Sequence, residues 1–147
     1  WGYVLNEIDV SVTVFDYDAQ AGRMTARQTV PAVPKSELAK EKAKSASEIR
    51  VHPNGRFVYS ANRGHDTITA YRVDPKNGRL TVIEREHVRG ATPRNFNLDP
   101  TGKWLLAGGQ ASHTLASFSV DQATGELTYN QNVVLAPSAI CVLIQPE

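Results

Sequence analysis

Apolar and polar residues form short runs along the chain, and turn-forming residues separate the runs. The clearest example lies between Ser47 and Arg89, where four runs occupy residues 49–51, 57–61, 67–73 and 80–83. The segments between them contain His-Pro-Asn-Gly, Asn-Arg-Gly-His-Asp and Asp-Pro-Lys-Asn-Gly. Runs of about 4–8 residues bounded by Gly, Pro, Asn and Asp are typical of strands joined by hairpins. This stretch is therefore predicted to form a four-stranded antiparallel sheet.

The turn residues of this sheet recur at a fixed distance along the chain. Pro53-Asn54-Gly55 recurs as Pro100-Thr101-Gly102, which is 47 residues later (100 minus 53), and Asp74…Gly78 recurs as Asp121…Gly125 at the same distance. An upstream copy, with Tyr3…Asn6 and Asp18…Gly22, precedes Tyr59…Asn62 and Asp74…Gly78 by 56 residues (59 minus 3). A four-strand repeat of about 40–50 residues indicates a β-propeller blade. We therefore expect an all-β fold, a β-propeller of four-stranded antiparallel blades; an all-β sandwich is the alternative.

The repeats divide the chain into five predicted parts. Residues 1–31 supply strands b to d of a first blade, 32–46 an insertion, 47–90 and 91–136 two complete blades, and 137–147 a closing strand. Further strands are expected at 1–6, 10–17, 25–30, 95–98, 104–107, 114–120, 127–135 and 139–144. Because propellers close with about 4–8 blades, these roughly three blades are expected to need more. A missing N-terminal half or another chain would supply them.

Composition excludes several classes of protein. The chain has 147 residues, enough for one domain with its own core, and a net charge of +1, which gives no electrostatic case for binding nucleic acid or an anionic membrane. No apolar run approaches the roughly 20 residues of a membrane-spanning helix. The single cysteine, Cys141, excludes an intrachain disulfide framework and fits a reducing compartment. Its place in the last predicted strand favours a buried thiol.

The insertion contains the only segment with the composition of a helix, residues 35–47. Ser36 is a candidate N-cap, and Leu38 is the only large apolar side chain. We interpret the segment as a mobile surface insertion with a short helix. A lysine-rich binding patch is the alternative.

Blade topology predicts where a site would lie. Strand a begins on the face where strand b ends, so residues around these two points converge on one rim. The polar members of this rim are Asn6, Glu7, Asn62, Arg63, His65, Asp66, Thr92, Arg94, Gln110 and His113. The opposite rim holds turn formers such as Asn77-Gly78 and Thr124-Gly125, for which a structural role is sufficient. We expect a structural role for His52 as well, because it precedes the turn Pro53-Asn54-Gly55.

Two rim residues carry candidate chemistry. Glu7 follows apolar Val4-Leu5, and a partly desolvated glutamate can act as a general acid or base. A solvated loop acid or a partner for Arg63 is the alternative. Arg94, between Pro93 and Phe96, could hold a phosphate or carboxylate or stabilise an oxyanion, and an inter-blade ion pair is the alternative. No Cys/His cluster has zinc spacing, and Ser112 lacks the Gly-x-Ser-x-Gly context of a hydrolase nucleophile.

Three segments resemble the lactonase seven-bladed β-propeller family. They are YVLNE at 3–7, SEIRVHPNGRFVYSANRGHDTITAYRVD at 47–74, and TPRNFNLDPTGKWLLAGGQASHTLASFSVD at 92–121. The family includes propeller-type 6-phosphogluconolactonases and is similar to fungal carboxymuconate-lactonizing enzymes. The ending PSAICVLI looks like the closing strand of that family. The resemblance covers nearly the whole chain except residues 31–46 and implies the C-terminal half of a protein of about seven blades.

The resemblance implies a cytoplasmic, cofactor-free enzyme of the pentose phosphate pathway that hydrolyses 6-phospho-glucono-lactone to 6-phosphogluconate. It implies catalytic roles for Glu7 and Arg94, and substrate-binding roles for Arg63, Gln110 and His113. A histidine that the lactonizing relatives use comes from an earlier blade, outside this sequence. One departure is Asn95, where many members carry Gly. A lactone-forming cyclase and a non-catalytic binding or scaffold propeller are the alternatives, and the latter predicts that Glu7 and Arg94 lie apart.

Overall fold

Three antiparallel sheets make up the computed structural model, which describes residues 1–145. The first sheet has three strands and the other two have four each. The first contains β1 (Gly2–Asn6), β2 (Ser11–Asp18) and β3 (Arg23–Pro31). The second contains β4 (Ser45–Val51), β5 (Phe57–Arg63), β6 (Thr67–Val73) and β7 (Leu80–His87). The third contains β8 (Pro93–Leu98), β9 (Trp104–Gly109), β10 (Thr114–Val120) and β11 (Leu127–Leu135).

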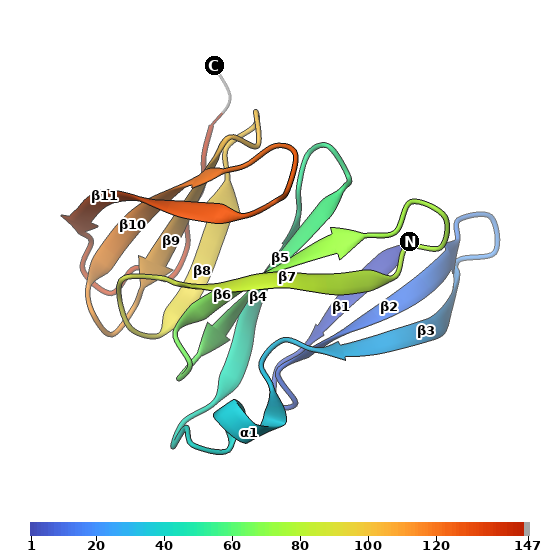
Figure 1. Cartoon of the computed structure of the whole chain (residues 1–147), viewed down its shortest axis with the longest axis horizontal. Helices are drawn as coiled ribbons and strands as arrows, with labels where there is room; N and C mark the ends of the chain where they lie inside the picture. Colours follow the sequence, from blue (N-terminus) through green and yellow to red (C-terminus); the bar gives the residue numbers. More distant parts are fainter. Residues whose placement is uncertain (146–147) are drawn as a thin grey trace.

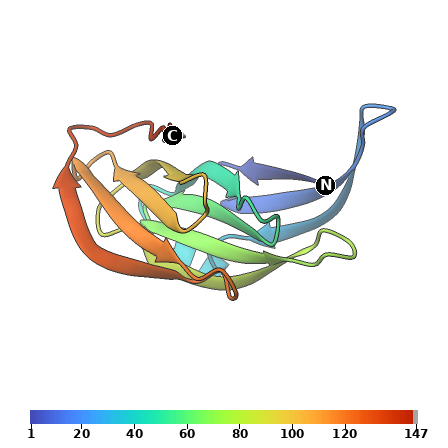
Figure 2. The same ribbon diagram turned by 90° about the horizontal axis from the view of Figure 1, so that it is seen from above.

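The three sheets stand next to one another like successive blades (Figure 1). Each sheet is a meander in which neighbouring strands follow one another in sequence. The strands β1, β4 and β8, here called the inner strands, touch across the sheet boundaries: β4 contacts both β1 and β8. Figure 2 shows that the C-terminal segment runs along the side on which these inner strands lie. The architecture is that of a partial β-propeller, as the repeat predicted.

The cores lie between adjacent sheets, and β5 serves two of them. Phe57 and Tyr59 pack in one apolar cluster with Phe96 and Phe118 of the third sheet. Val58, on the opposite face of β5, packs in a second cluster with residues of β2. Since successive side chains of a strand point to opposite faces, a strand between two neighbours must be apolar on both. This explains why β5 is buried over nearly its whole length.

The same contacts join the first sheet to the second and the second to the third. The Tyr3 hydroxyl donates to the Gly78 carbonyl at 3.0 Å, and the equivalent Tyr59 hydroxyl donates to the Gly125 carbonyl at 2.8 Å. The side chain of Gln28 bonds to the backbone of Leu80, and the equivalent Glu84 accepts from the Leu127 N–H. The repeat in the sequence is therefore also a repeat of inter-sheet contacts.

The insertion contains one short helix, α1 (Lys35–Leu38), which begins after Pro34 without a side-chain cap. The expected Ser36 cap is therefore wrong. The helix is attached through Leu38, which is buried in the cluster between the first two sheets. The strand after the insertion is longer than predicted, because β4 begins at Ser45 where Ala46 is already buried. No helix among the described residues has the length and apolar character needed to cross a bilayer.

The predicted closing strand is wrong for residues 139–144, which form no strand, and positions 146–147 of that prediction lie outside the described residues. The backbone of Val142 bonds to two side chains of β8 instead of to a strand. Its N–H donates to Asn95 Oδ1 at 2.8 Å, and its carbonyl accepts from Asn97 Nδ2 at 3.1 Å. The prediction of a buried Cys141 fails for the same reason, because the segment lies on the surface and its thiol is exposed.

Candidate functional site

Two asparagines fix the ends of the strands that carry the rim residues. Asn6 Nδ2 donates to the hydroxyls of Ser11 (3.0 Å) and Thr13 (2.8 Å) on the next strand. Asn62 Nδ2 makes the equivalent bonds to Thr67 (3.0 Å) and Thr69 (2.9 Å). Each asparagine directly precedes a charged residue, Glu7 or Arg63. The local sequence thus holds both charged side chains at the same end of adjacent sheets.

Glu7 and Arg63 form an ion pair between the first and second sheets. Arg63 Nη2 donates to Glu7 Oε1 at 2.5 Å and to the Ala46 carbonyl at 2.9 Å. The Arg63 side chain is 15% exposed, whereas that of Glu7 is 61% exposed. The second carboxylate oxygen of Glu7, Oε2, bonds to no described residue. The partner role that the sequence left open for Glu7 is therefore real, and it leaves one oxygen available.

Arg94 faces the same space from the third sheet. A pocket of about 410 Å³, here called the rim pocket, is lined by Glu7, Ser47, Glu48, Arg63 and Arg94, with Leu5, Ala46 and Ile49 completing its wall. This volume lies within the range of small-molecule sites. The Arg94 guanidinium makes no hydrogen bond or ion pair with residues 1–145, so the inter-blade ion pair considered as its alternative role does not form among them. The rim pocket thus brings together two arginines and a carboxylate that the sequence had singled out.

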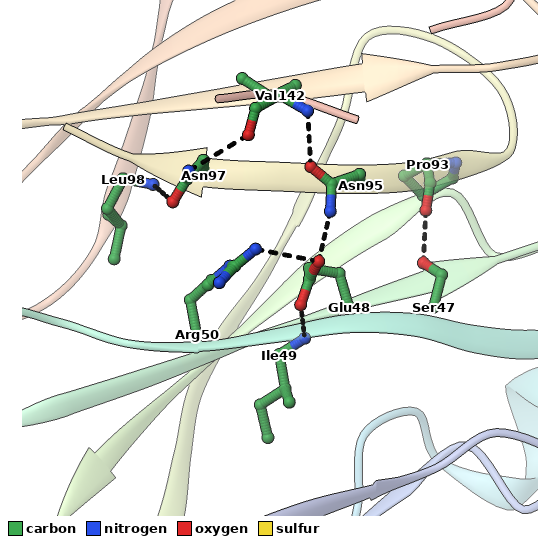
Figure 3. Close-up of polar contacts among 9 residues, drawn as sticks. All are labelled: Ser47, Glu48, Ile49, Arg50, Pro93, Asn95, Asn97, Leu98 and Val142. Carbon is green, nitrogen blue, oxygen red and sulfur yellow. Dashed lines mark hydrogen bonds and ion pairs between the residues drawn. The ribbon is translucent and has the colours of Figure 1, made fainter. Parts of the chain in front are cut away.

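Glu48 is a second pocket carboxylate, and it was not among the site residues predicted from the sequence. Its side chain is 20% exposed and is held by Asn95 of β8, by Arg50 and by its neighbour Ile49 (Figure 3). Next to it, the Ser47 hydroxyl donates to the Pro93 carbonyl at 2.5 Å and ties β4 to β8. A signal existed in the repeat, because Glu48 stands one repeat before Asn95 and Ser47 one repeat before Arg94.

The remaining predicted residues do not line the rim pocket. The Gln110 N–H donates to the Thr92 carbonyl at 3.0 Å, and His113 Nδ1 accepts from the Ser138 N–H at 2.9 Å. Asp66 Oδ1 accepts from the N–H of Thr92 at 2.9 Å, and His65 lies 3.2 Å from Glu37. The substrate-binding roles of Gln110 and His113 stay predictions. On the opposite rim, His52 is buried and bonds to the Gly102 carbonyl at 2.9 Å, which is a contact between sheets.

A second cavity, of about 530 Å³, shares Arg63 with the rim pocket and is here called the basic cavity. Its wall includes Lys42, Lys44, Ser45 and Thr92, so it has three cationic side chains and no acidic one. Gly64 brings the lysine segment close, because it adopts φ +88° and a Cβ there would lie 1.8 Å from the Ala43 carbonyl oxygen. The lysines of the alternative binding patch, Lys42 and Lys44, therefore line a cavity next to the rim pocket.

Comparison with known proteins places the chain among lactonase propellers. A family model described as "Lactonase, 7-bladed beta-propeller" matches residues 1–144. An uncharacterised protein of Lactococcus lactis, YwcC, is 33% identical over 96% of this chain and 40% of its own length. A 6-phosphogluconolactonase of Bacillus subtilis is 36% identical over 67% of this chain and 28% of its own length.

The crystal structure of a Lactobacillus plantarum protein superposes with a TM-score of 0.89 and 28% identity. The superposition covers 95% of this chain and 40% of that protein. The chain therefore spans at most about 40% of the length of these relatives.

Proposed function

Because the chain belongs to the lactonase seven-bladed β-propeller family, we propose that it supplies part of the active site of a lactone hydrolase acting on 6-phospho-glucono-lactone. The observation that carries this proposal is the rim pocket, in which Glu7, Arg63 and Arg94 come from three different sheets. Further blades would complete the ring around it. The product would be 6-phosphogluconate, which places the reaction in the pentose phosphate pathway.

Lactone hydrolysis needs a proton acceptor and a site for negative charge. Water adds to the carbonyl carbon and loses a proton, the carbonyl oxygen becomes an oxyanion, and the ring C–O bond then breaks as the ring oxygen takes up a proton. Glu7 Oε2 would accept the proton of the water and return it to the ring oxygen. Arg94 would stabilise the oxyanion. Arg63 would hold Glu7 in place through its 2.5 Å bond to Oε1.

The basic cavity supports a phosphorylated substrate. A phosphate dianion needs several cationic donors, and Lys42 and Lys44 stand beside Arg63 there. Because Arg63 lines both cavities, a lactone in the rim pocket could extend its phosphate into the basic cavity. An unphosphorylated lactone would leave the basic cavity empty.

The catalytic role is tested by Glu7→Gln in the full-length protein that contains this chain. Gln keeps the size of the side chain but cannot accept a proton, so kcat should fall by about 10²–10⁴-fold. Glu41→Gln is the matched control, since Glu41 lies outside the rim pocket. Urea unfolding checks that both variants fold, and spontaneous lactone hydrolysis is subtracted. An unchanged rate in Glu7→Gln would refute the role.

The phosphate preference is tested with phosphorylated and unphosphorylated gluconolactone. Lys42→Gln should raise KM for the phosphorylated lactone about tenfold and leave the unphosphorylated one unaffected. Lys40→Gln is the control, because Lys40 belongs to the same segment but does not line the basic cavity. Equal effects on both lactones, or a wild-type protein that prefers the unphosphorylated one, would reject the phosphorylated substrate.

A further inference from the structure

The Glu48 carboxylate is held more firmly than that of Glu7. Oε2 accepts from Asn95 Nδ2 and from Arg50 Nη2 at 3.2 Å, and Oε1 accepts from the Ile49 N–H at 3.0 Å (Figure 3). A carboxylate offers roughly four acceptor positions on its two oxygens. Described residues use three, which leaves about one, on Oε1. Glu48 therefore presents a fixed acceptor at the wall of the rim pocket.

The amide of Asn95 can have only one orientation. Its side chain is buried, and Oδ1 accepts from the Val142 N–H at 2.8 Å. A backbone N–H can only donate, so it requires the oxygen of the amide on that side. The NH2 group must then point the other way, toward Glu48. Asn95 thus links the C-terminal segment to Glu48: the Val142 N–H orients the amide, and the amide NH2 group then donates to the Glu48 carboxylate.

We propose that Glu48 is a substrate-binding residue that accepts a hydrogen bond from a hydroxyl group of a polyhydroxylated lactone, and that Asn95 is its positioning residue. The assignment rests on the proposed function, because the ligand class is that of a sugar lactone. A sugar lactone carries several hydroxyl donors besides its carbonyl. The arginines of the rim pocket are donors only, so they cannot accept from those hydroxyls, whereas Glu48 can.

The first test is Glu48→Gln in the full-length protein, with two measurements. KM for 6-phospho-glucono-lactone should rise about 10- to 100-fold, the cost of losing a hydrogen bond to a charged group, with a smaller change in kcat. Calorimetry should show a similar loss of affinity for 6-phosphogluconate and no loss for inorganic phosphate, which has the anion but no sugar hydroxyls. Unchanged KM and affinity, or an equal loss for both ligands, would overturn the role of Glu48.

These outcomes separate the inference from the proposed function. If the wild-type protein hydrolyses the lactone but Glu48→Gln changes neither KM nor affinity, only the role of Glu48 is refuted. If the wild-type protein fails to hydrolyse the lactone but Glu48→Gln still selectively weakens binding of the sugar acid, only the proposed function fails. A wild-type protein that neither hydrolyses the lactone nor binds the sugar acid overturns both.

The second test separates positioning from folding. Asn95→Asp keeps an oxygen for the Val142 N–H but replaces the donor to Glu48 by a like charge, so KM should rise as in Glu48→Gln. Asn97→Asp is the matched control, because Asn97 bonds to the same Val142 and does not touch Glu48. The Glu48→Gln/Asn95→Asp double variant should be no worse than Glu48→Gln alone. Losses that multiply in the double variant, or an Asn97→Asp effect equal to that of Asn95→Asp, would refute the positioning role.

Discussion

The repeated tyrosine contact between sheets can be tested by removing one hydroxyl at a time. Tyr59 is fully buried, and its hydroxyl donates to the Gly125 carbonyl at 2.8 Å. Tyr59→Phe leaves that buried carbonyl without this donor, and the space of one oxygen atom is too small for a water molecule to replace it. The expected cost is the desolvation of an unsatisfied acceptor, about 1–3 kcal/mol.

The equivalent tyrosine in the first sheet provides an internal comparison. Tyr3 makes the same bond to the Gly78 carbonyl at 3.0 Å, but its side chain is only half-buried. Water can therefore replace its hydroxyl, and Tyr3→Phe should cost less than about 1 kcal/mol. Urea unfolding of the full-length protein measures both values from the shift in midpoint at constant slope.

A second readout uses pH. Burial, with further contributions from the charges of Glu84 and Asp121, raises the pKa of Tyr59. A group whose pKa is raised in the folded state contributes stability that is complete below its unfolded pKa, about 10 for tyrosine, and is lost as the pH rises above it. Tyr59→Phe should therefore reduce the loss of stability above pH ~10. A larger cost for Tyr3→Phe than for Tyr59→Phe, or an unaltered alkaline transition in Tyr59→Phe, would show that burial does not set the strength of this contact.

Two further predictions concern turns. Gly64→Ala should destabilise the protein by more than about 1 kcal/mol and raise KM for a phosphorylated lactone, because the new Cβ would clash with the Ala43 carbonyl. Gly55→Ala is the control in urea unfolding, because Gly55 has φ +70° with nothing within 4 Å and its substitution adds only backbone strain. Equal losses of stability in the two variants would exclude the clash. The N–H groups of Thr124 and Ala123 lower the pKa of Asp121, so its contribution to stability is present above the ordinary pKa of 3.8 and is lost as the pH falls through the lower folded value. Asp121→Asn should therefore lower the urea midpoint at pH 7 and have little effect at pH ~2, and a deficit that stays constant with pH would contradict this linkage.

The sequence was informative wherever the structure depends on local turns. The strand 67–73 was predicted with its observed bounds, and the blades followed from the recurrence of Gly78 as Gly125. A turn is fixed by a few adjacent residues, so the distance between successive turns can be read from the sequence without knowing which strands pair. The fold class was confirmed for this reason, and the family match confirmed the resemblance of the three longer segments.

The errors concern contacts between distant segments. The closing strand at 139–144 had the apolar composition of a strand, but a strand also needs a backbone partner, and Asn95 and Asn97 bind Val142 by their side chains instead. Glu48 was missed because an isolated glutamate in a strand resembles a solvated residue. Its importance depends on Asn95, which is 47 residues away. The convergence of Glu7 and Arg94 could be anticipated only because blade topology fixes which strand ends meet.

The repeat also explains how one scaffold can build a charged pocket. Between the sheets, equivalent positions keep the same type of contact, since Tyr3 and Tyr59 make the same bond. On the rim they differ, and Glu7 pairs with Arg63, the residue at the same position one repeat later, 56 residues along the chain. Identical charged residues at these two positions would place like charges side by side, which is unfavourable. Divergence at the rim therefore allows adjacent blades to hold an ion pair, while the repeated contacts between the sheets preserve the packing that positions it.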